Sequence, residues 1–140
     1  MANPGPASTV TANLQNLSSN QAIRLLAVYN NVNVNATGDT VLPVIASGAY
    51  SVSNVIFTNA SISLTTAAAG VFTAPGAGGT AIVANAALST CTGPTIVFQR
   101  TVASTAVATA QKLYVNVGTA QGAAATVDVY VYGYDFSAEV

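Results

Sequence analysis

Residues 127–136 read VDVYVYGYDF, in which valines alternate with aromatic residues over most of the stretch. Successive side chains of a β-strand point to opposite faces of the sheet, so this alternation predicts a strand with two different apolar faces. It is the clearest strand in the chain. One face would carry Val127, Val129 and Val131, and the other would carry Tyr130, Tyr132, Tyr134 and Phe136.

Shorter β-rich runs, separated by turn residues, precede this strand. Pro43 cannot donate to a ladder, so it marks its own run as an edge strand or a bulge. The Gly/Ala-rich residues 67–80 predict a loop with a brief extended segment at 71–73, and residues 103–110 are ambiguous between helix and strand. The strands that we expect are residues 22–35, 40–45, 50–58, 61–64, 81–84, 95–102, 113–117 and 127–136.

About eight short strands without a convincing helix predict an all-β fold, an antiparallel β-sandwich that is jelly-roll-like. An immunoglobulin-like sandwich is the alternative, but its Cys-Trp-Cys pattern is absent, because the chain has one cysteine and no tryptophan. We expect a single sandwich domain over residues 20–140. An extended N-terminal arm is expected over residues 1–19, which are rich in Ser, Thr and Asn and show no sustained periodicity.

Charged residues make up only 5% of the chain, and histidine is absent. Ordinary soluble domains carry about 25% charged residues. Most enzymes depend on an ionisable group with a tuned pKa, so we expect no enzyme, and no catalytic, cofactor-binding or metal-binding residues. Asp128 and Asp135 are seven positions apart on one predicted strand, which places them on opposite faces and prevents a carboxylate pair.

Nucleic acids and membranes are not expected partners. The three cations are scattered and cannot neutralise a phosphate track. No segment approaches the roughly 20 consecutive apolar residues of a membrane-spanning helix. The first residues lack the basic and apolar regions of a secretory signal, so we expect synthesis in the cytoplasm. The small net charge also gives little repulsion between copies, which favours a homo-oligomer.

The aromatic face of residues 127–136 has three interpretations: the core, a subunit interface in which tyrosine is enriched, or a platform for sugar rings. The absence of tryptophan counts against the platform. Two arginines stand alone in apolar runs and are expected at a rim or an interface, since an unpaired buried cation is costly; if either is buried, a carboxylate is the expected partner. The candidate interface residues are Tyr130, Tyr132, Tyr134, Phe136, Arg24 and Arg100.

Cys91 is the single cysteine, which excludes an internal disulfide. We expect it to be a small apolar filler or a loop residue. An intermolecular disulfide is the next alternative. A nucleophilic role is the least favoured, because the chain has no histidine to activate the thiol.

Several short blocks of the chain form one group. They are VIFTNAS at 55–61, LTTA at 64–67, GVFTAP at 70–75, GGTAIV at 78–83 and QGAAATVDVYVYGY at 121–134. These blocks resemble small virion proteins of tailed bacteriophages. The similarity covers roughly residues 50–84 and 113–136 and includes no catalytic motif.

The resemblance implies a β-rich protein that decorates or cements a phage head, commonly as a trimer seated on the shell. The expected partner is the major capsid protein, and the expected location is the capsid surface of a virion made in the host cytoplasm. The arm would extend over the shell or clasp a neighbouring copy. A receptor- or glycan-binding module of a fibre or tail is the alternative function, and other virion parts stay open.

Overall fold

The computed structural model describes residues 23–137. The arm predicted for residues 1–19 lies outside the described residues. Within residues 23–137 the chain forms strands joined by turns and loops, and no helix is present. The strands are β1 (Arg24–Asn33), β2 (Gly38–Pro43), β3 (Tyr50–Thr58), β4 (Ala68–Ala74), β5 (Gly78–Ala87), β6 (Val97–Arg100), β7 (Lys112–Thr119) and β8 (Thr126–Asp135).

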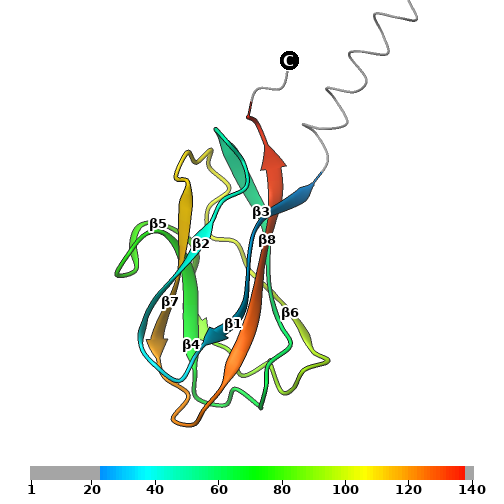
Figure 1. The fold of residues 1–140 in the computed structure, drawn as a ribbon, viewed down its shortest axis with the longest axis vertical. Helices are drawn as coiled ribbons and strands as arrows, with labels where there is room; N and C mark the ends of the chain where they lie inside the picture. Colours follow the sequence, from blue (N-terminus) through cyan, green and yellow to red (C-terminus); the bar gives the residue numbers. More distant parts are fainter. Residues whose placement is uncertain (1–22, 138–140) are drawn as a thin grey trace, which may run out of the picture.

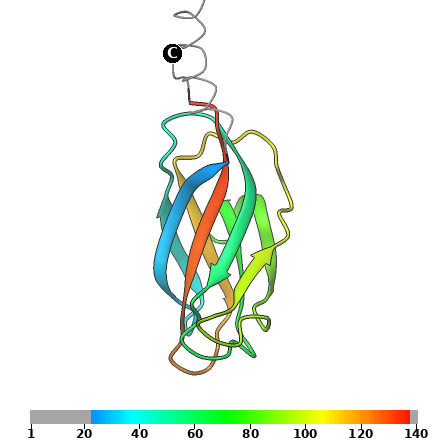
Figure 2. The ribbon, with the colours of Figure 1, turned by 90° about the vertical axis from the view of Figure 1, so that its right-hand side faces the viewer.

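These strands form two antiparallel sheets of four, with the orders β1-β8-β3-β6 and β2-β7-β4-β5 (Figure 1). Strand β1 pairs with β8, β2 with β7, β3 with β6 and β4 with β5, so the chain is wound as one long folded-over hairpin. This order is that of a jelly roll. Figure 2 shows the β1-β8-β3-β6 sheet as one layer and the second sheet behind it. The predicted antiparallel, jelly-roll-like sandwich is confirmed.

The core lies between the two sheets, and β8 supplies its centre. Val127, Val129 and Val131 are completely buried and face the second sheet. Full burial of one such side chain stabilises the fold by about 1.5–3 kcal/mol. The valine face of residues 127–136 is therefore the core. The interpretation that placed the aromatic face in the core is wrong.

Two predictions near the middle of the chain, a strand and a loop, are also wrong. Residues 61–64 do not form a strand: they belong to the connection from β3 to β4, which crosses between the sheets. Leu64 is nevertheless completely buried there, and its amide donates to the carbonyl oxygen of Cys91 at 2.9 Å. The alternation of apolar and polar residues in this segment therefore reflects the burial of Leu64 in a loop between the sheets, and not the pairing of a strand.

Residues 67–80, predicted as a loop, contain β4 and the start of β5. Small residues are required there because the β4 and β5 backbones approach closely: a Cβ on Gly70 would lie 2.5 Å from the carbonyl oxygen of Val83. The β4–β5 ladder is irregular, with register shifts on both sides of Val71. The Gly/Ala composition thus serves a bulged hairpin, which composition alone does not distinguish from a loop.

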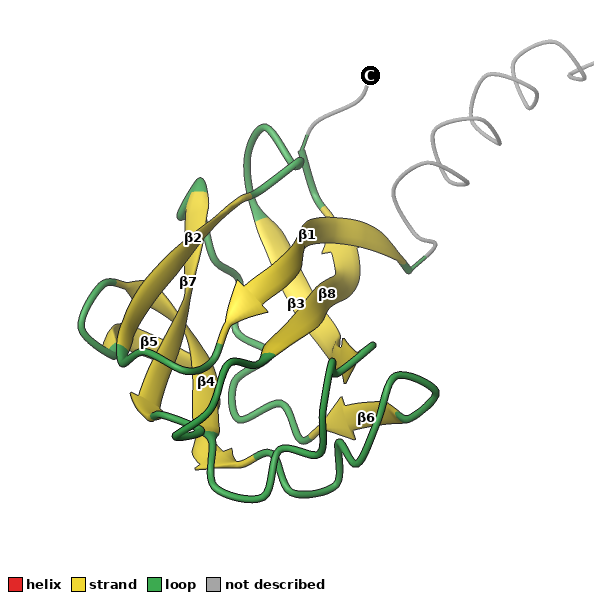
Figure 3. Cartoon of the chain, turned by 60° about the horizontal axis from the view of Figure 1, so that its bottom comes forward, coloured by secondary structure: helices red, strands yellow, loops and turns green. Residues whose placement is uncertain are grey.

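The ambiguous residues 103–110 form neither a helix nor a regular strand. They run beside the first half of β3, where the short β6 has already ended, as the loop-coloured trace in Figure 3 shows. The amides of Tyr50 and Ala108 donate to each other's carbonyl oxygens at 2.9 and 2.8 Å. Strand β2 lies at an edge of its sheet and ends at Pro43, as the proline predicts.

Candidate functional site

The tyrosines of β8 line the outer face of the β1-β8-β3-β6 sheet. Strand β8 lies between β1 and β3, so each tyrosine has a neighbour on both sides. Tyr130 lies opposite Val28 and Ile56. Directly opposed residues of an antiparallel pair share a face of the sheet. We call this surface the tyrosine face; its members are Leu25, Val28, Asn54, Ile56, Tyr130, Tyr132 and Tyr134.

The aromatic rings of this surface are ordered in two stacked pairs. Tyr130 and Tyr132 have ring centroids 6.5 Å apart with an interplanar angle of 15°. Tyr134 and Phe136, the residue just after β8, are 6.4 Å apart at 11°. Tyr134 is 36% exposed and Phe136 is 47% exposed, so the surface is most open at this end. The structure thus brings together all four aromatic residues that the sequence proposed.

Charged groups stand near the two ends of β8, and no member of the tyrosine face is charged. Asp128, near one end, is buried and accepts hydrogen bonds from the Asn31 backbone amide at 2.7 Å and the Asn59 side-chain amide at 3.0 Å. Both asparagines have positive φ angles, 61° and 54°. Asp128 therefore stabilises two left-handed backbone positions.

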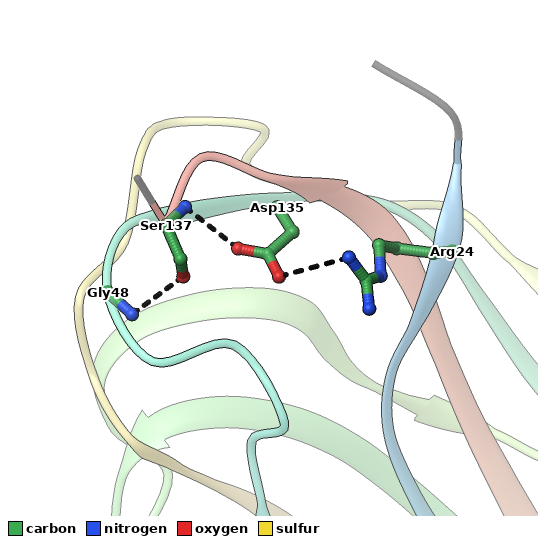
Figure 4. Close-up of polar contacts among 4 residues, drawn as sticks. All are labelled: Arg24, Gly48, Asp135 and Ser137. Carbon is green, nitrogen blue, oxygen red and sulfur yellow. Dashed lines mark hydrogen bonds and ion pairs between the residues drawn. The ribbon is translucent and has the colours of Figure 1, made fainter. Parts of the chain in front are cut away.

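The opposite end carries Arg24 and Asp135 (Figure 4). A guanidinium nitrogen of Arg24 lies 3.5 Å from the Asp135 carboxylate. The other carboxylate oxygen accepts the backbone amide of Ser137 at 2.8 Å, and the Ser137 hydroxyl accepts the amide of Gly48 at 2.8 Å. This network joins the start of β1, the end of β8 and the β2–β3 connection. Arg24 lies at the surface, and its place at a rim or an interface stays a prediction.

Part of the outer face of the second sheet is covered by the protein itself. The turn after β4 crosses it, and the amide of Gly76 donates to the Asp39 carboxylate on β2 at 2.8 Å. Asn116 donates to the same carboxylate at 2.9 Å. Phe72, which points to this outer side opposite Tyr114, is only 6% exposed. The turn after β4 therefore covers part of this outer face, where Val41 is still 40% exposed. At the tyrosine face, the exposed aromatic residues are Tyr134 and Phe136 at one end.

Arg100 does not lie at a rim or an interface, and that prediction is wrong. It is 5% exposed and points from β6 into the gap between the sheets. Its Nη1 donates to the Ala69 carbonyl at 3.0 Å and its Nη2 to the Ala84 carbonyl at 2.9 Å. Its guanidinium carbon also lies 5.2 Å from the ring centre of Phe57 and 5.4 Å from that of Phe98.

The partners of Arg100 explain why its burial is tolerated. Carbonyl oxygens of the opposite sheet and the faces of two rings attract the cation, so no carboxylate is needed. A carboxylate partner can be proposed from the sequence, whereas the backbone carbonyl oxygens of Ala69 and Ala84 become partners only through the tertiary fold. Burial lowers the pKa of the Arg100 guanidinium, and nearby Cys91 partly opposes this effect.

Cys91 is completely buried in the core cluster, in agreement with the predicted small apolar filler. Burial raises the pKa of its thiol, and the positive charge of Arg100 opposes the rise. A neutral thiol without solvent access does not form a disulfide with another chain. The structure therefore gives Cys91 a packing role.

Other kinds of site find little support in the described part of the chain. Among residues 23–137, no three or more His, Cys, Asp or Glu side chains gather closely enough to hold a metal ion. The same residues contain no helix with the length and apolar character needed to cross a membrane. In comparisons with known proteins, no family model, no curated protein and no solved structure matches this chain.

Proposed function

We propose that this chain is a structural virion protein, a capsid decoration or cement protein that binds the outer surface of a phage head. The observation that carries the proposal is the tyrosine face: an uncharged surface along which four aromatic rings lie in two stacked pairs, the pair at one end being exposed. Exposed apolar patches on stable domains mark binding surfaces, and tyrosine is enriched in them. The partner proposed for this face is the major capsid protein.

Three further features support a structural role. The chain has seven charged residues, so its surface packs against neighbours without desolvating many ions. Jelly rolls recur in viral capsid proteins, although a fold alone does not define a function. The short blocks that resemble virion proteins of tailed phages point in the same direction. Assembly as a homotrimer on the shell, after synthesis in the host cytoplasm, is part of this proposal.

The mechanism is stabilisation by selective binding. A protein that binds the assembled shell, and not the dissociated capsid subunits, shifts the equilibrium toward the shell by mass action. Each copy would bridge neighbouring capsid subunits. The sandwich suits this task because Tyr130 and Tyr132 lie on β8, and the valines on the other face of β8 are completely buried in the core. This burial fixes the position of the strand that carries the tyrosines.

The direct test is to detect the chain in phage particles purified on a density gradient. Digestion should use chymotrypsin, because the chain has only three Lys and Arg residues and yields few tryptic peptides. We expect peptides of the chain in intact particles. When the particles are disrupted and their remaining parts are sedimented again, these peptides should no longer be found in the sediment. Absence of the chain from particles whose other structural proteins are detected would overturn the proposal.

A second experiment tests the surface. Particles that lack the chain are mixed with purified wild-type protein or with a Tyr132→Ser, Tyr134→Ser double variant. Wild type should cosediment with the particles and raise the temperature at which they release their genome. The variant should bind at least about tenfold more weakly if the tyrosine face is the contact surface. Val41→Ser, a variant on the outer face of the second sheet where Val41 is 40% exposed, is the control and should bind as wild type does.

A glycan- or receptor-binding module is the second candidate, because sugar rings also stack on exposed aromatic rings such as Tyr134 and Phe136. A glycan array separates the two functions. Binding to a defined sugar that is lost in the Tyr134→Ser variant would favour the module, whereas an array without hits would count against it.

A further inference from the structure

A groove opens at the edge of the sandwich where β5 and β6 lie side by side without pairing. Its volume is about 350 Å³, within the range of small-molecule sites. Most of its wall is apolar and consists of alanine methyl groups and one aromatic ring. The lining residues are Ala84, Ala86 and Ala87 of β5, Phe98, Gln99 and Arg100 of β6, and Thr101 and Ala103 beyond it.

Arg100 is the only charged residue in this wall. A guanidinium has five N–H donors. Two of them are used by the carbonyl oxygens of Ala69 and Ala84. Among residues 23–137, no carboxylate lies within ion-pair distance of Arg100, and the ion pair found there joins Arg24 to Asp135. The groove thus combines an apolar wall with a buried guanidinium, three of whose five N–H donors are not used by these two carbonyl oxygens.

We propose that this groove binds a small organic carboxylate. The remaining N–H donors of Arg100 would hold the carboxylate, and the alanine methyl groups and the Phe98 ring would contact a short apolar body. A carboxylate matches the planar donor geometry of a guanidinium. A phosphate carries more charge, and one arginine in an apolar wall does not offset its desolvation.

Among residues 23–137, Arg100 has no partner that carries a full negative charge. Carbonyl dipoles and ring faces compensate part of the cost of burying a cation, but each supplies less than a full opposite charge. An incoming carboxylate supplies that charge beside a guanidinium that is itself only 5% exposed, where its attraction is stronger than between two fully exposed ions. This inference is independent of the virion proposal, since it concerns a different edge of the molecule.

The test is a nuclear magnetic resonance titration of the ¹⁵N-labelled full chain with hexanoate, hexan-1-ol and acetate. Hexan-1-ol has the apolar body without the charge, and acetate has the carboxylate without the body. We expect hexanoate to shift the amide signals of residues 84–87 and 98–101 saturably. Hexan-1-ol and acetate should each bind at least about tenfold more weakly, because each lacks one of the two contacts.

Two variants locate the site. Ala86 lies opposite the buried Ala69 and so faces the groove, and Ala86→Leu should fill it while leaving Arg100 in place. This variant should weaken hexanoate binding at least about tenfold. Ala124→Leu, at an exposed alanine of the β7–β8 connection, is the matched control and should bind as wild type does. Arg100→Met should abolish the preference for hexanoate over hexan-1-ol.

The proposal is overturned if hexanoate causes no saturable shifts in wild type, if hexan-1-ol binds equally well, or if Ala86→Leu leaves hexanoate binding unchanged. The circular dichroism spectrum of each variant shows whether it is folded. If Arg100→Met is unfolded, the comparison of Ala86→Leu with Ala124→Leu decides the outcome by itself.

Discussion

The guanidinium of Arg24 lies 3.5 Å from the carboxylate of Asp135, so an ion pair joins the first residue of β1 to the last residue of β8. The two strands are already paired along their length, and the ion pair closes their open end. The Asp135 side chain is only 11% exposed, whereas the Arg24 side chain is 43% exposed. The carboxylate is therefore fixed by its surroundings, and the more exposed arginine side chain reaches toward it. This contact lies at the end of β8 near the exposed Tyr134 and Phe136, but on the core side of the strand, since Asp135 is paired with the buried Tyr50.

The first prediction concerns this pair. Asp135→Asn keeps an oxygen for the Ser137 amide but removes the charge that attracts Arg24. Because Arg24 is partly exposed and the pair is screened by solvent, we expect a loss of only about 0.5–1 kcal/mol in the free energy of unfolding by urea. A double-mutant cycle with Arg24→Gln isolates the pair. A coupling energy indistinguishable from zero would contradict the assignment.

The second prediction compares neighbours on opposite faces of β8. Val131→Ala removes two methyl groups from a completely buried site and should cost about 2 kcal/mol or more in unfolding free energy. Tyr132→Ser, one residue later on the half-buried outer face, should cost about 1 kcal/mol or less. Urea titrations of both variants give the comparison. A larger loss for Tyr132→Ser would mean that the tyrosine face stabilises the single chain instead of serving a partner.

The third prediction tests the close approach of β4 and β5. Gly70→Ala places a methyl group 2.5 Å from the carbonyl oxygen of Val83, a backbone atom that cannot move aside freely. We expect a loss of about 1–3 kcal/mol in stability, visible as a lower melting temperature. Gly93→Ala is the matched control, because no atom lies within 4 Å of its added Cβ. Equal melting temperatures for the two variants would refute the steric argument.

The fourth prediction is a loss of stability at alkaline pH. Burial raises the pKa of the Cys91 thiol and of the Tyr50 hydroxyl, which donates to the Ala110 carbonyl oxygen. The unfolded chain therefore releases these two protons first as the pH rises, so the free energy of unfolding falls above the ordinary thiol pKa and is unaffected below it.

Urea titrations at about pH 7 and about pH 10 measure this effect. The Cys91→Ala, Tyr50→Phe double variant lacks both groups and should lose less stability between the two pH values than wild type does. The same alkaline loss in both proteins would show that other groups cause it. At neutral pH, Cys91 should react with a thiol reagent only after unfolding, because its side chain is fully buried.

Much of the fold was predictable because the responsible patterns are local. The alternation in residues 127–136 and the β-rich run at 50–58 mark β8 and β3 closely, and Pro43 marks an edge strand. Gly/Ala-rich residues 67–80 gave no such pattern. Their strands depend on the close approach of one backbone to another, which is a tertiary relationship.

The candidate site was predictable in part. The sequence alone determined that one strand carries valines on one side and aromatic rings on the other, since side-chain direction in a strand follows from the period of the backbone. Both sides are apolar, so the pattern cannot choose which of them faces the core. That choice was made when the second sheet packed against Val129 and its neighbours and left Tyr130 outside.

The same division holds for the arginines. The sequence determined that this chain has few charges, and therefore few ways to build an ionic site. Only the tertiary structure decided that Arg24 meets Asp135 at the surface while Arg100 is buried. The physical reason is that a buried cation needs acceptors, and those of Arg100 are carbonyl oxygens of β4 and β5, which become available only when the two sheets face each other.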